Sequence, residues 1–152
     1  MEDSALPAAQ CQAVVLSCSD YRFVEPMRRF LARRGLTGTV DLIAWPGGAA
    51  ALATPDRDAI IDTIRMACEL DSPAEIVLVA HHDCDRLGGS ACFAGPQAEI
   101  ATLETALAIA GEVVAEQFPS LRLQLVRLDP NGPRTVIAGS RRDVPAVLAG
   151  SR

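Results

Sequence analysis

The sequence predicts one α/β domain built on a mainly parallel sheet with helices on both faces. Three observations lead to this prediction. Short apolar runs alternate with longer segments of helical periodicity, which is the pattern of strand–helix–strand units. The runs are apolar at successive positions, as in strands buried on both faces. With 152 residues, 49% of them hydrophobic, the chain can form one sizeable core but is too short for two.

The expected elements follow one another along the chain. Residues 1–12 lack periodicity and are expected to form a flexible N-terminal arm, so that a single domain spans residues 13–152. Strands are expected at residues 13–16, 39–45, 75–80 and 121–128, and helices at 23–34, 54–70 and 97–117. A short fifth edge strand at 135–138 and a last helical turn at 143–148 complete the expected elements.

Local signals justify these elements in turn. Gly35 ends the first helix, and Thr54 and Pro55 are favourable as the N-cap and first position of the second. The third strand is the most apolar. The third helix carries an apolar face wider than one sheet needs, which indicates a subunit contact. The fourth strand alternates leucine with arginine and glutamine, which predicts one side near water and an edge position.

Composition excludes several classes of function. A net charge of −5, a pI near 5.0 and 4% aromatic residues do not suit nucleic-acid binding. No apolar stretch reaches the roughly 18 residues of a membrane span, and the first dozen residues do not resemble a signal peptide. We therefore expect a cytoplasmic protein. Five cysteines are an odd number without a dense framework, which favours metal binding or burial over disulfides.

Two segments with reactive side chains follow apolar runs. They are Cys18-Ser19-Asp20-Tyr21-Arg22 and His81-His82-Asp83-Cys84. Thiols and imidazoles are zinc ligands, so we expect Cys18, His81 and Cys84 to hold one Zn²⁺. The first and third strands must then lie side by side, about 4.8 Å apart, with the second strand beyond the first. The predicted strand order is therefore 2-1-3-4, with a ligand-binding switch point between strands one and three.

Within the second segment, His81 and His82 compete as ligands. Neighbouring side chains on a strand point to opposite faces, so only one can readily join Cys84, and we favour His81. His82 is expected beside the ligands or on the surface. Three protein ligands leave a fourth position open, as in catalytic zinc sites; Cys92 is the plausible rival for that position.

Asp20 and Arg22 flank the expected ligand Cys18. Their spacing lets both side chains reach the open position and each other. A carboxylate paired with a cation there accepts a hydrogen bond from hydroxide on the metal, which favours a role in the site over a surface ion pair. For proton export, His82 and Asp83 are the candidate shuttle groups.

The paired motifs Cys18-x-Asp20-x-Arg22 and His81-x-x-Cys84 resemble those of the β-class carbonic anhydrase family. The strand and helix pattern from about residue 12 to 138 looks like the compact core of that family. The resemblance implies that Cys18, His81 and Cys84 are zinc ligands and that Asp20 and Arg22 form the catalytic dyad. It also implies a homodimer with active sites near the subunit interface.

The sequence departs from the family pattern in three places, as a compact, divergent member would. Ala44-Trp45-Pro46-Gly47-Gly48 stands where the family commonly has Arg-Asn-Ala-Gly-Asn, and Asp85 stands where glycine usually follows the second cysteine. A long N-terminal helical arm is also lacking. We expect Trp45 and Asp85 to lie beside the ligands.

The leading hypothesis is reversible hydration of carbon dioxide to bicarbonate by hydroxide formed on the zinc. Asp20 would orient the hydroxide, and Arg22 would hold Asp20. Two alternatives remain. One is hydrolysis of a related small molecule, carbon disulfide or carbonyl sulfide. The other is a non-catalytic zinc-binding dimer in which Asp83 or Asp85 blocks the open position.

Overall fold

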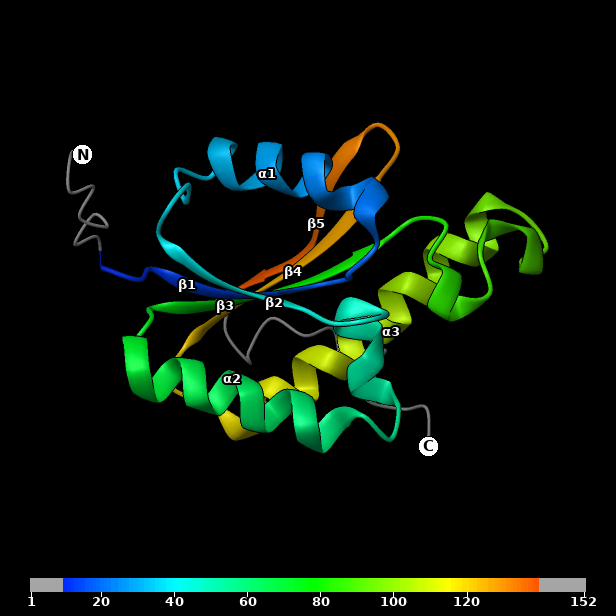
Figure 1. The fold of residues 1–152 in the computed structure, drawn as a ribbon. Coiled ribbons are helices and arrows are strands. Elements are labelled where there is room, and N and C mark those ends of the chain that lie inside the picture. Colours follow the sequence, from blue (N-terminus) through cyan, green and yellow to red (C-terminus); the bar gives the residue numbers. More distant parts are fainter. Residues whose placement is uncertain (1–9, 140–152) are drawn as a thin grey trace.

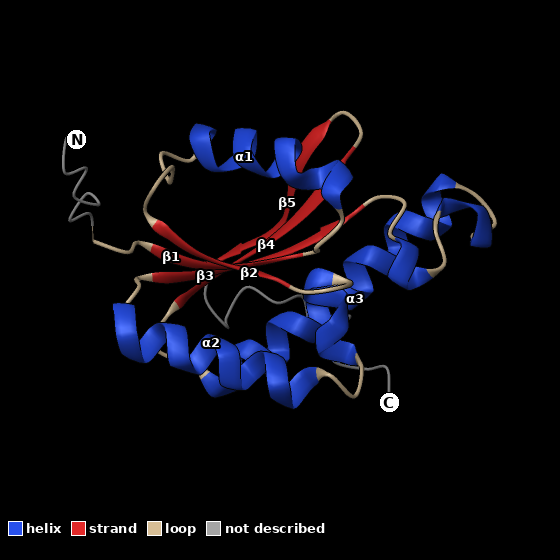
Figure 2. Cartoon of the chain, in the orientation of Figure 1, coloured by secondary structure: helices blue, strands red, loops and turns tan. Residues whose placement is uncertain are grey.

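The structure is a computed structural model that describes residues 10–139. One five-stranded sheet lies between helices (Figures 1 and 2). The strands are β1 (Ala13–Ser17), β2 (Val40–Ala44), β3 (Glu75–His81), β4 (Arg122–Asp129) and β5 (Gly132–Gly139). The α-helices are α1 (Val24–Arg33), α2 (Arg57–Asp71) and α3 (Pro96–Gln117). Four short 3₁₀ helices are η1 (Tyr21–Phe23), η2 (Gly48–Ala53), η3 (Asp85–Leu87) and η4 (Ser90–Cys92).

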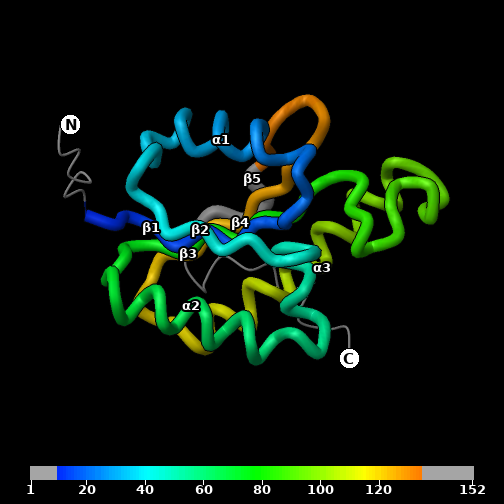
Figure 3. Tube along the Cα trace, viewed as in Figure 1, coloured from blue at the N-terminus to red at the C-terminus, as the bar shows by residue number. Residues whose placement is uncertain are grey.

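The strand order is β2-β1-β3-β4-β5. The first four strands in this order pair in parallel, which confirms the predicted order 2-1-3-4 and the switch point between β1 and β3. The carboxyl ends of β1 and β3 therefore lie side by side at one edge of the sheet (Figure 3). This is where open α/β sheets bind their ligands.

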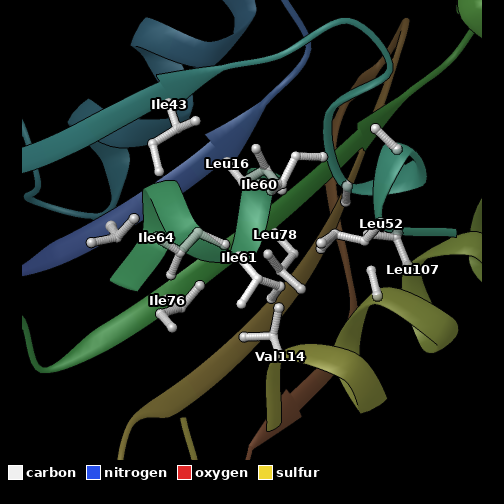
Figure 4. Packing of buried hydrophobic residues seen from close by; sticks show 14 of the residues in the cluster. Leu16, Ile43, Leu52, Ile60, Ile61, Ile64, Ile76, Leu78, Leu107 and Val114 are labelled. Carbon is white, nitrogen blue, oxygen red and sulfur yellow. The ribbon is translucent and has the colours of Figure 1, made fainter. Parts of the chain in front are cut away.

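Helices cover both faces of the sheet, as predicted: α1 lies on one face, and α2 and α3 lie on the other (Figure 1). The strands alternate between these two layers. In β1, Val14 and Leu16 pack in the cluster shared with α2 and α3, whereas Ala13 and Val15 pack under α1. Figure 4 shows the larger cluster. Each fully buried Leu, Ile or Val side chain contributes about 1.5–3 kcal/mol through removal of apolar surface from water.

The fifth strand differs from the prediction. It begins at Gly132, earlier than expected, and pairs antiparallel with β4 through a two-residue turn at Pro130 and Asn131. Because β5 covers that side, β4 is an inner strand and the predicted edge position is wrong. Its second half is buried, and its Arg127 is paired with Glu104 and Asp129.

The predicted helix boundaries lie close to the observed ones, except at the start of the second helix. Helix α2 begins at Arg57, because Thr54 instead forms a turn in which its Oγ1 accepts the Asp56 N–H at 3.2 Å. The expected loop between β3 and α3 contains η3 and η4, and η2 follows β2.

The last helical turn expected at 143–148 and most of the expected arm at 1–12 lie outside the described residues. The single domain over 13–152 stays a prediction. Among residues 10–139, the structure contains no helix that is long and apolar enough to cross a membrane.

Candidate metal centre

The structure brings Cys18, His81 and Cys84 together. Cys18 follows β1, His81 is the last residue of β3, and Cys84 lies in the turn after it. Their ligand atoms all lie within 4.8 Å of one another. The adjacency of β1 and β3 therefore creates this cluster from residues far apart in the sequence.

The buried His81 ring has one nitrogen bonded and one free. Nδ1 lies 2.7 Å from the His82 carbonyl oxygen, which can only accept, so Nδ1 carries the proton. Nε2 is among the few buried side-chain atoms of the described residues that have no hydrogen-bond partner. The Phe23 ring packs on the imidazole with centroids 3.9 Å apart. In its neutral form the ring thus presents the Nε2 lone pair beside the two sulfurs, as in metal-binding histidines.

The two thiols share one proton. The Gly47 N–H donates to Cys18 Sγ at 3.3 Å. The hydrogen bond from Cys84 lowers the pKa of Cys18 to about 4, against the opposing effect of burial. The same interaction, together with burial, raises the pKa of Cys84. One thiolate is therefore stabilised, and a cation is needed to ionise the second.

The glycine pair Gly47-Gly48 lets the backbone of η2 lie close to Cys18 and to β3. Gly48 has φ of 53°, and a Cβ there would lie 2.7 Å from the Cys18 nitrogen and 2.7 Å from the Val79 carbonyl oxygen. Only glycine fits this close approach of η2 to β1 and β3. The pair ends the segment Ala44-Trp45-Pro46-Gly47-Gly48, which departs from the family pattern, and the structure places it at the switch point.

Arg22 holds Asp20 in a bidentate pair beside the cluster. Arg22 Nη2 donates to Asp20 Oδ2 at 2.6 Å and Nε donates to Oδ1 at 3.1 Å. The hydrogen bonds from Arg22 lower the pKa of Asp20 to about 2, so the carboxylate is charged at neutral pH. Asp20 Oδ2 also lies 3.9 Å from His81 Nε2, close to where a cation held by the cluster would sit.

Asp83 lies on the other side of the Arg22 guanidinium. Its Oδ2 and its carbonyl oxygen each accept a hydrogen bond from Arg22 at 2.8 Å. Asp85, by contrast, has a side chain that is 91% exposed, and its Oδ1 lies 3.8 Å from Arg22 Nη2. Arg22 is therefore surrounded by carboxylates, with Asp20 and Asp83 as its direct partners.

His82 points away from the ligands, toward α3. Its Nδ1 lies 3.1 Å from the buried carboxylate of Glu99, in the first turn of α3. Sequence reasoning missed Glu99. A signal was present, because Glu99 precedes Leu103 by one helical turn and so places a carboxylate on an apolar stripe.

Two other expected residues make contacts elsewhere. The Trp45 indole N–H donates to Asp56 at 3.2 Å, and the ring packs against the core shared with α2 and α3. The exposed Cys92 donates to the Leu87 carbonyl oxygen at 3.2 Å. A groove of about 490 Å³ lies beside the Arg22–Asp83 pair, and Arg22, His82 and Asp83 form part of its lining.

The sequence matches a family model described as "Putative carbonic anhydrase" over residues 8–116. The chain belongs to this family. Two curated relatives are named only as uncharacterized proteins. RC0076 of Rickettsia conorii is 26% identical over 121 residues, which are 75% of this chain and 65% of that protein. The relative from Rickettsia bellii is 23% identical over 121 residues, 75% of this chain and 74% of its own length. The chain thus spans less than two thirds of the first relative.

Solved β-carbonic anhydrases share the fold of this family member. Isoform I from Trichomonas vaginalis has a TM-score of 0.61 and 16% identity, covering 90% of this chain and 88% of its own. A tetrameric enzyme from Sordaria macrospora has a TM-score of 0.57 and 13% identity, covering 87% and 83%. CafA of Aspergillus fumigatus has a TM-score of 0.53 and 15% identity, covering 84% and 76%.

Proposed function

We propose that this protein is a zinc-dependent carbonic anhydrase that hydrates carbon dioxide reversibly to bicarbonate. The observation that carries the proposal is His81 Nε2, which is buried, lacks a hydrogen-bond partner among the described residues and belongs to a group of atoms with the Cys18 and Cys84 sulfurs. A buried lone pair without a partner costs free energy, and a cation bound between it and the sulfurs removes that cost. The family supports the reaction class.

The ligand set suits zinc. Two thiolates and one imidazole are soft or borderline ligands, and three protein ligands leave the open position that distinguishes catalytic from structural zinc sites. When bound, zinc lowers the pKa of water from 15.7 to about 7 and so supplies hydroxide for attack on carbon dioxide.

Asp20 and Arg22 orient the reacting groups in this proposal. Because Arg22 keeps the pKa of Asp20 at about 2, Asp20 only accepts hydrogen bonds at neutral pH. It would therefore accept a hydrogen bond from a hydroxide held at the centre, which would turn an oxygen lone pair toward the carbon. Arg22 contributes by fixing the carboxylate in this orientation.

Stopped-flow hydration of carbon dioxide by zinc-loaded protein tests the function, with metal-free protein as the control. We expect hydration well above the buffer rate only with zinc. Turnover of carbon disulfide or carbonyl sulfide without hydration would favour the hydrolase alternative, and zinc binding without either activity would favour a non-catalytic protein. Against a blocking role for Asp83, both of its carboxylate oxygens already accept hydrogen bonds, from Arg22 and Ser90.

We also propose that the protein is a homodimer or a higher homo-oligomer. Tyr21 is 84% exposed and Val24 is 64% exposed, and both lie within four residues of Asp20. Apolar side chains exposed beside a functional centre are typical of a surface that a partner covers. The Sordaria macrospora enzyme is itself described as tetrameric. Sedimentation showing only monomer at micromolar concentration would contradict this proposal.

The cytoplasm is the compartment we propose. All five cysteines are unpaired in the structure, and a centre with two thiolate ligands requires reduced thiols. The net charge of −5 favours neither nucleic acid nor an anionic membrane surface as a partner, so a small molecule and a second copy of the chain are the proposed ones.

A further inference from the structure

We propose that Glu99 is a positioning residue of this centre: its buried carboxylate holds Asp83, and through Asp83 it holds the Arg22 guanidinium that orients Asp20. This inference rests on the proposed function, because the role of Asp20 does. It adds a residue from α3 that belongs to none of the motifs in the sequence.

Arg22 is held from two sides. Its Nε and Nη2 donate to Asp20, while Nη1 donates to Asp83 Oδ2 and Nη2 also donates to the Asp83 carbonyl oxygen, both at 2.8 Å. A planar guanidinium with donors engaged on two edges has one orientation. Because its side chain is 37% exposed, Arg22 depends on these two partners to stay in place. The direction of the Asp20 carboxylate therefore depends on the position of Asp83.

Asp83 adopts a conformation that needs support. It has φ of 54°, in the left-handed region that residues other than glycine rarely occupy. This conformation presents both the carbonyl oxygen and the carboxylate of Asp83 to Arg22. Two contacts hold it: the Asp83 N–H donates to Glu99 Oε1 at 2.7 Å, and Asp83 Oδ1 accepts from the Ser90 N–H at 2.8 Å.

Glu99 gathers three residues of the loop between β3 and α3. Besides the Asp83 N–H, its carboxylate accepts the Ser90 hydroxyl at 2.8 Å and lies 3.1 Å from His82 Nδ1. Glu99 is only 3% exposed, and a buried carboxylate is stable only with such partners. Its place in the first turn of α3 adds the favourable interaction of an anion with a helix N-terminus.

A purely structural role for Glu99 makes a different prediction. If Glu99 only stabilised the loop, its replacement would lower stability without changing the Arg22 environment in the folded protein. If Glu99 positions Asp83, its replacement should also change the environment of Arg22, although Glu99 does not contact Arg22. The Arg22 Nε–H resonance in ¹⁵N–¹H NMR spectra reports on this directly, because Nε donates to Asp20.

Glu99→Gln is the variant to test, with Glu112→Gln as its matched control. Glutamine keeps the size of the side chain but replaces one acceptor oxygen with a donor, which opposes the donors from Ser90 or His82. Glu112 is an exposed acid on the same helix. For Glu99→Gln we expect a shifted, faster-exchanging Arg22 Nε–H signal and a loss of about 10–100-fold in kcat for hydration at unchanged zinc content. Glu112→Gln should change neither.

A double-mutant cycle with Asp83→Asn tests the route through Asp83. Asp83→Asn weakens the charged contact with Arg22 but keeps the N–H that donates to Glu99 and the carbonyl oxygen that accepts from Arg22. If Glu99 acts through Asp83, the loss in the variant that carries both substitutions should therefore be smaller than the product of the two single losses. Losses that multiply would show that Glu99 acts independently of Asp83, and would overturn the inference.

The glutamine oxygen can still accept the Asp83 N–H, so Glu99→Ala is the variant that removes this contact outright. An unchanged Arg22 signal in folded Glu99→Ala protein would also overturn the inference. If that variant does not fold, Ser90→Ala replaces it: removal of one donor to Glu99 should shift the same signal in the same direction, and no shift would contradict the proposal. A wild-type protein that does not hydrate carbon dioxide would refute the proposed function, whereas the NMR comparison would still decide whether Glu99 positions Arg22.

Discussion

Arg22 is the cation on which the charge balance of the centre depends. It is bonded to Asp20 and Asp83 and lies 3.8 Å from Asp85, so a single guanidinium faces three carboxylates. Its hydrogen bonds lower the pKa of Asp20, and it adds to the effect of the Ser90 N–H in lowering the pKa of Asp83. Asp20, whose folded pKa is depressed to about 2, contributes stability above its unfolded pKa that is lost as the pH falls toward 2.

Arg22→Ala should free the Asp20 carboxylate to compete with water for the open position on the metal. Asp20 Oδ2 is only 3.9 Å from His81 Nε2, so the released carboxylate can take the position intended for water. We expect hydration to fall by about 10–100-fold near neutral pH, with recovery at alkaline pH, where hydroxide competes better with the carboxylate. Zinc content should not change, because the ligands are intact. Arg28→Ala, which removes only an exposed pair with Glu25, is the control.

Unchanged hydration by Arg22→Ala between about pH 7 and 9 would show that the pair is a surface feature only. Zinc X-ray absorption spectra provide a second measurement. An additional carboxylate oxygen in the variant would support ligand exchange, and a spectrum identical to that of the wild type would contradict it.

Cys84→Ser should abolish stoichiometric zinc binding. A serine hydroxyl does not replace a thiolate as a soft ligand, and only two protein ligands, Cys18 and His81, would remain. Cys92→Ser removes an exposed thiol whose hydrogen bond is to the Leu87 carbonyl, and should leave zinc content unchanged. Metal analysis of purified proteins is the measurement. Full zinc content in both Cys84→Ser and Cys18→Ser would contradict the ligand assignment.

For single residues, the sequence predicted the cluster of Cys18, His81 and Cys84 but not the residues that pack and bond around it. Cys18, His81 and Cys84 were predictable because each follows an apolar strand, and alternation along β3 separated His81 from His82. The position of Glu99 on an apolar stripe was visible in the sequence, but its partners were not, since they depend on how the loop before α3 folds back. The contact between Trp45 and Asp56 was hidden for the same reason.

The short helix η2 fixes the geometry between β1 and β3, and Gly48 is its critical residue. Gly48→Ala should force the backbones apart, because the added Cβ would lie 2.7 Å from the Cys18 nitrogen, just after β1, and 2.7 Å from the Val79 carbonyl oxygen in β3. We expect a loss of about 1–3 kcal/mol in the free energy of unfolding and weaker zinc binding. Gly38→Ala is the matched control, since Gly38 also has positive φ but a Cβ there meets nothing within 4 Å.

Chemical denaturation and zinc titration of both variants separate steric from conformational effects. If Gly38→Ala destabilises the protein as much and weakens zinc as much as Gly48→Ala, the close approach at Gly48 has no special role. A zinc affinity reduced only in Gly48→Ala would support it.

Elements with strong local patterns were predictable, and those that depend on pairing were not. The first three parallel strands followed from their apolar runs and the fourth from its alternating leucines, and the strand order followed from the need to join Cys18 to His81. β5 was expected to be shorter, because Gly132 and Pro133 are poor strand residues that pairing with β4 accommodates at the start of a hairpin. η2 and η3 carry no periodic signal, since each spans only one or two turns.

For the whole molecule, the centre joins parts of the chain that are distant in sequence. Cys18 follows β1, whereas His81 and Cys84 come after α2 and β3. A bound cation therefore links the two halves of the parallel sheet at its switch point. Zinc should stabilise the folded protein, because binding to the folded state alone adds about 1.4 kcal/mol for each tenfold excess of free zinc over its dissociation constant.

This stabilisation should grow with pH, and the sign follows from the two thiols. In the metal-free protein the pKa of Cys18 is lowered to about 4 and that of Cys84 is raised, so near neutral pH the pair holds one proton. Zinc needs both thiolates and displaces that proton, so its affinity should rise about tenfold per pH unit. The increase in melting temperature caused by zinc should therefore be larger at about pH 8 than at about pH 6, measured by calorimetry at fixed free zinc. Cys92→Ser should show the same dependence, while a zinc effect independent of pH would mean that Cys84 does not lose a proton to the metal.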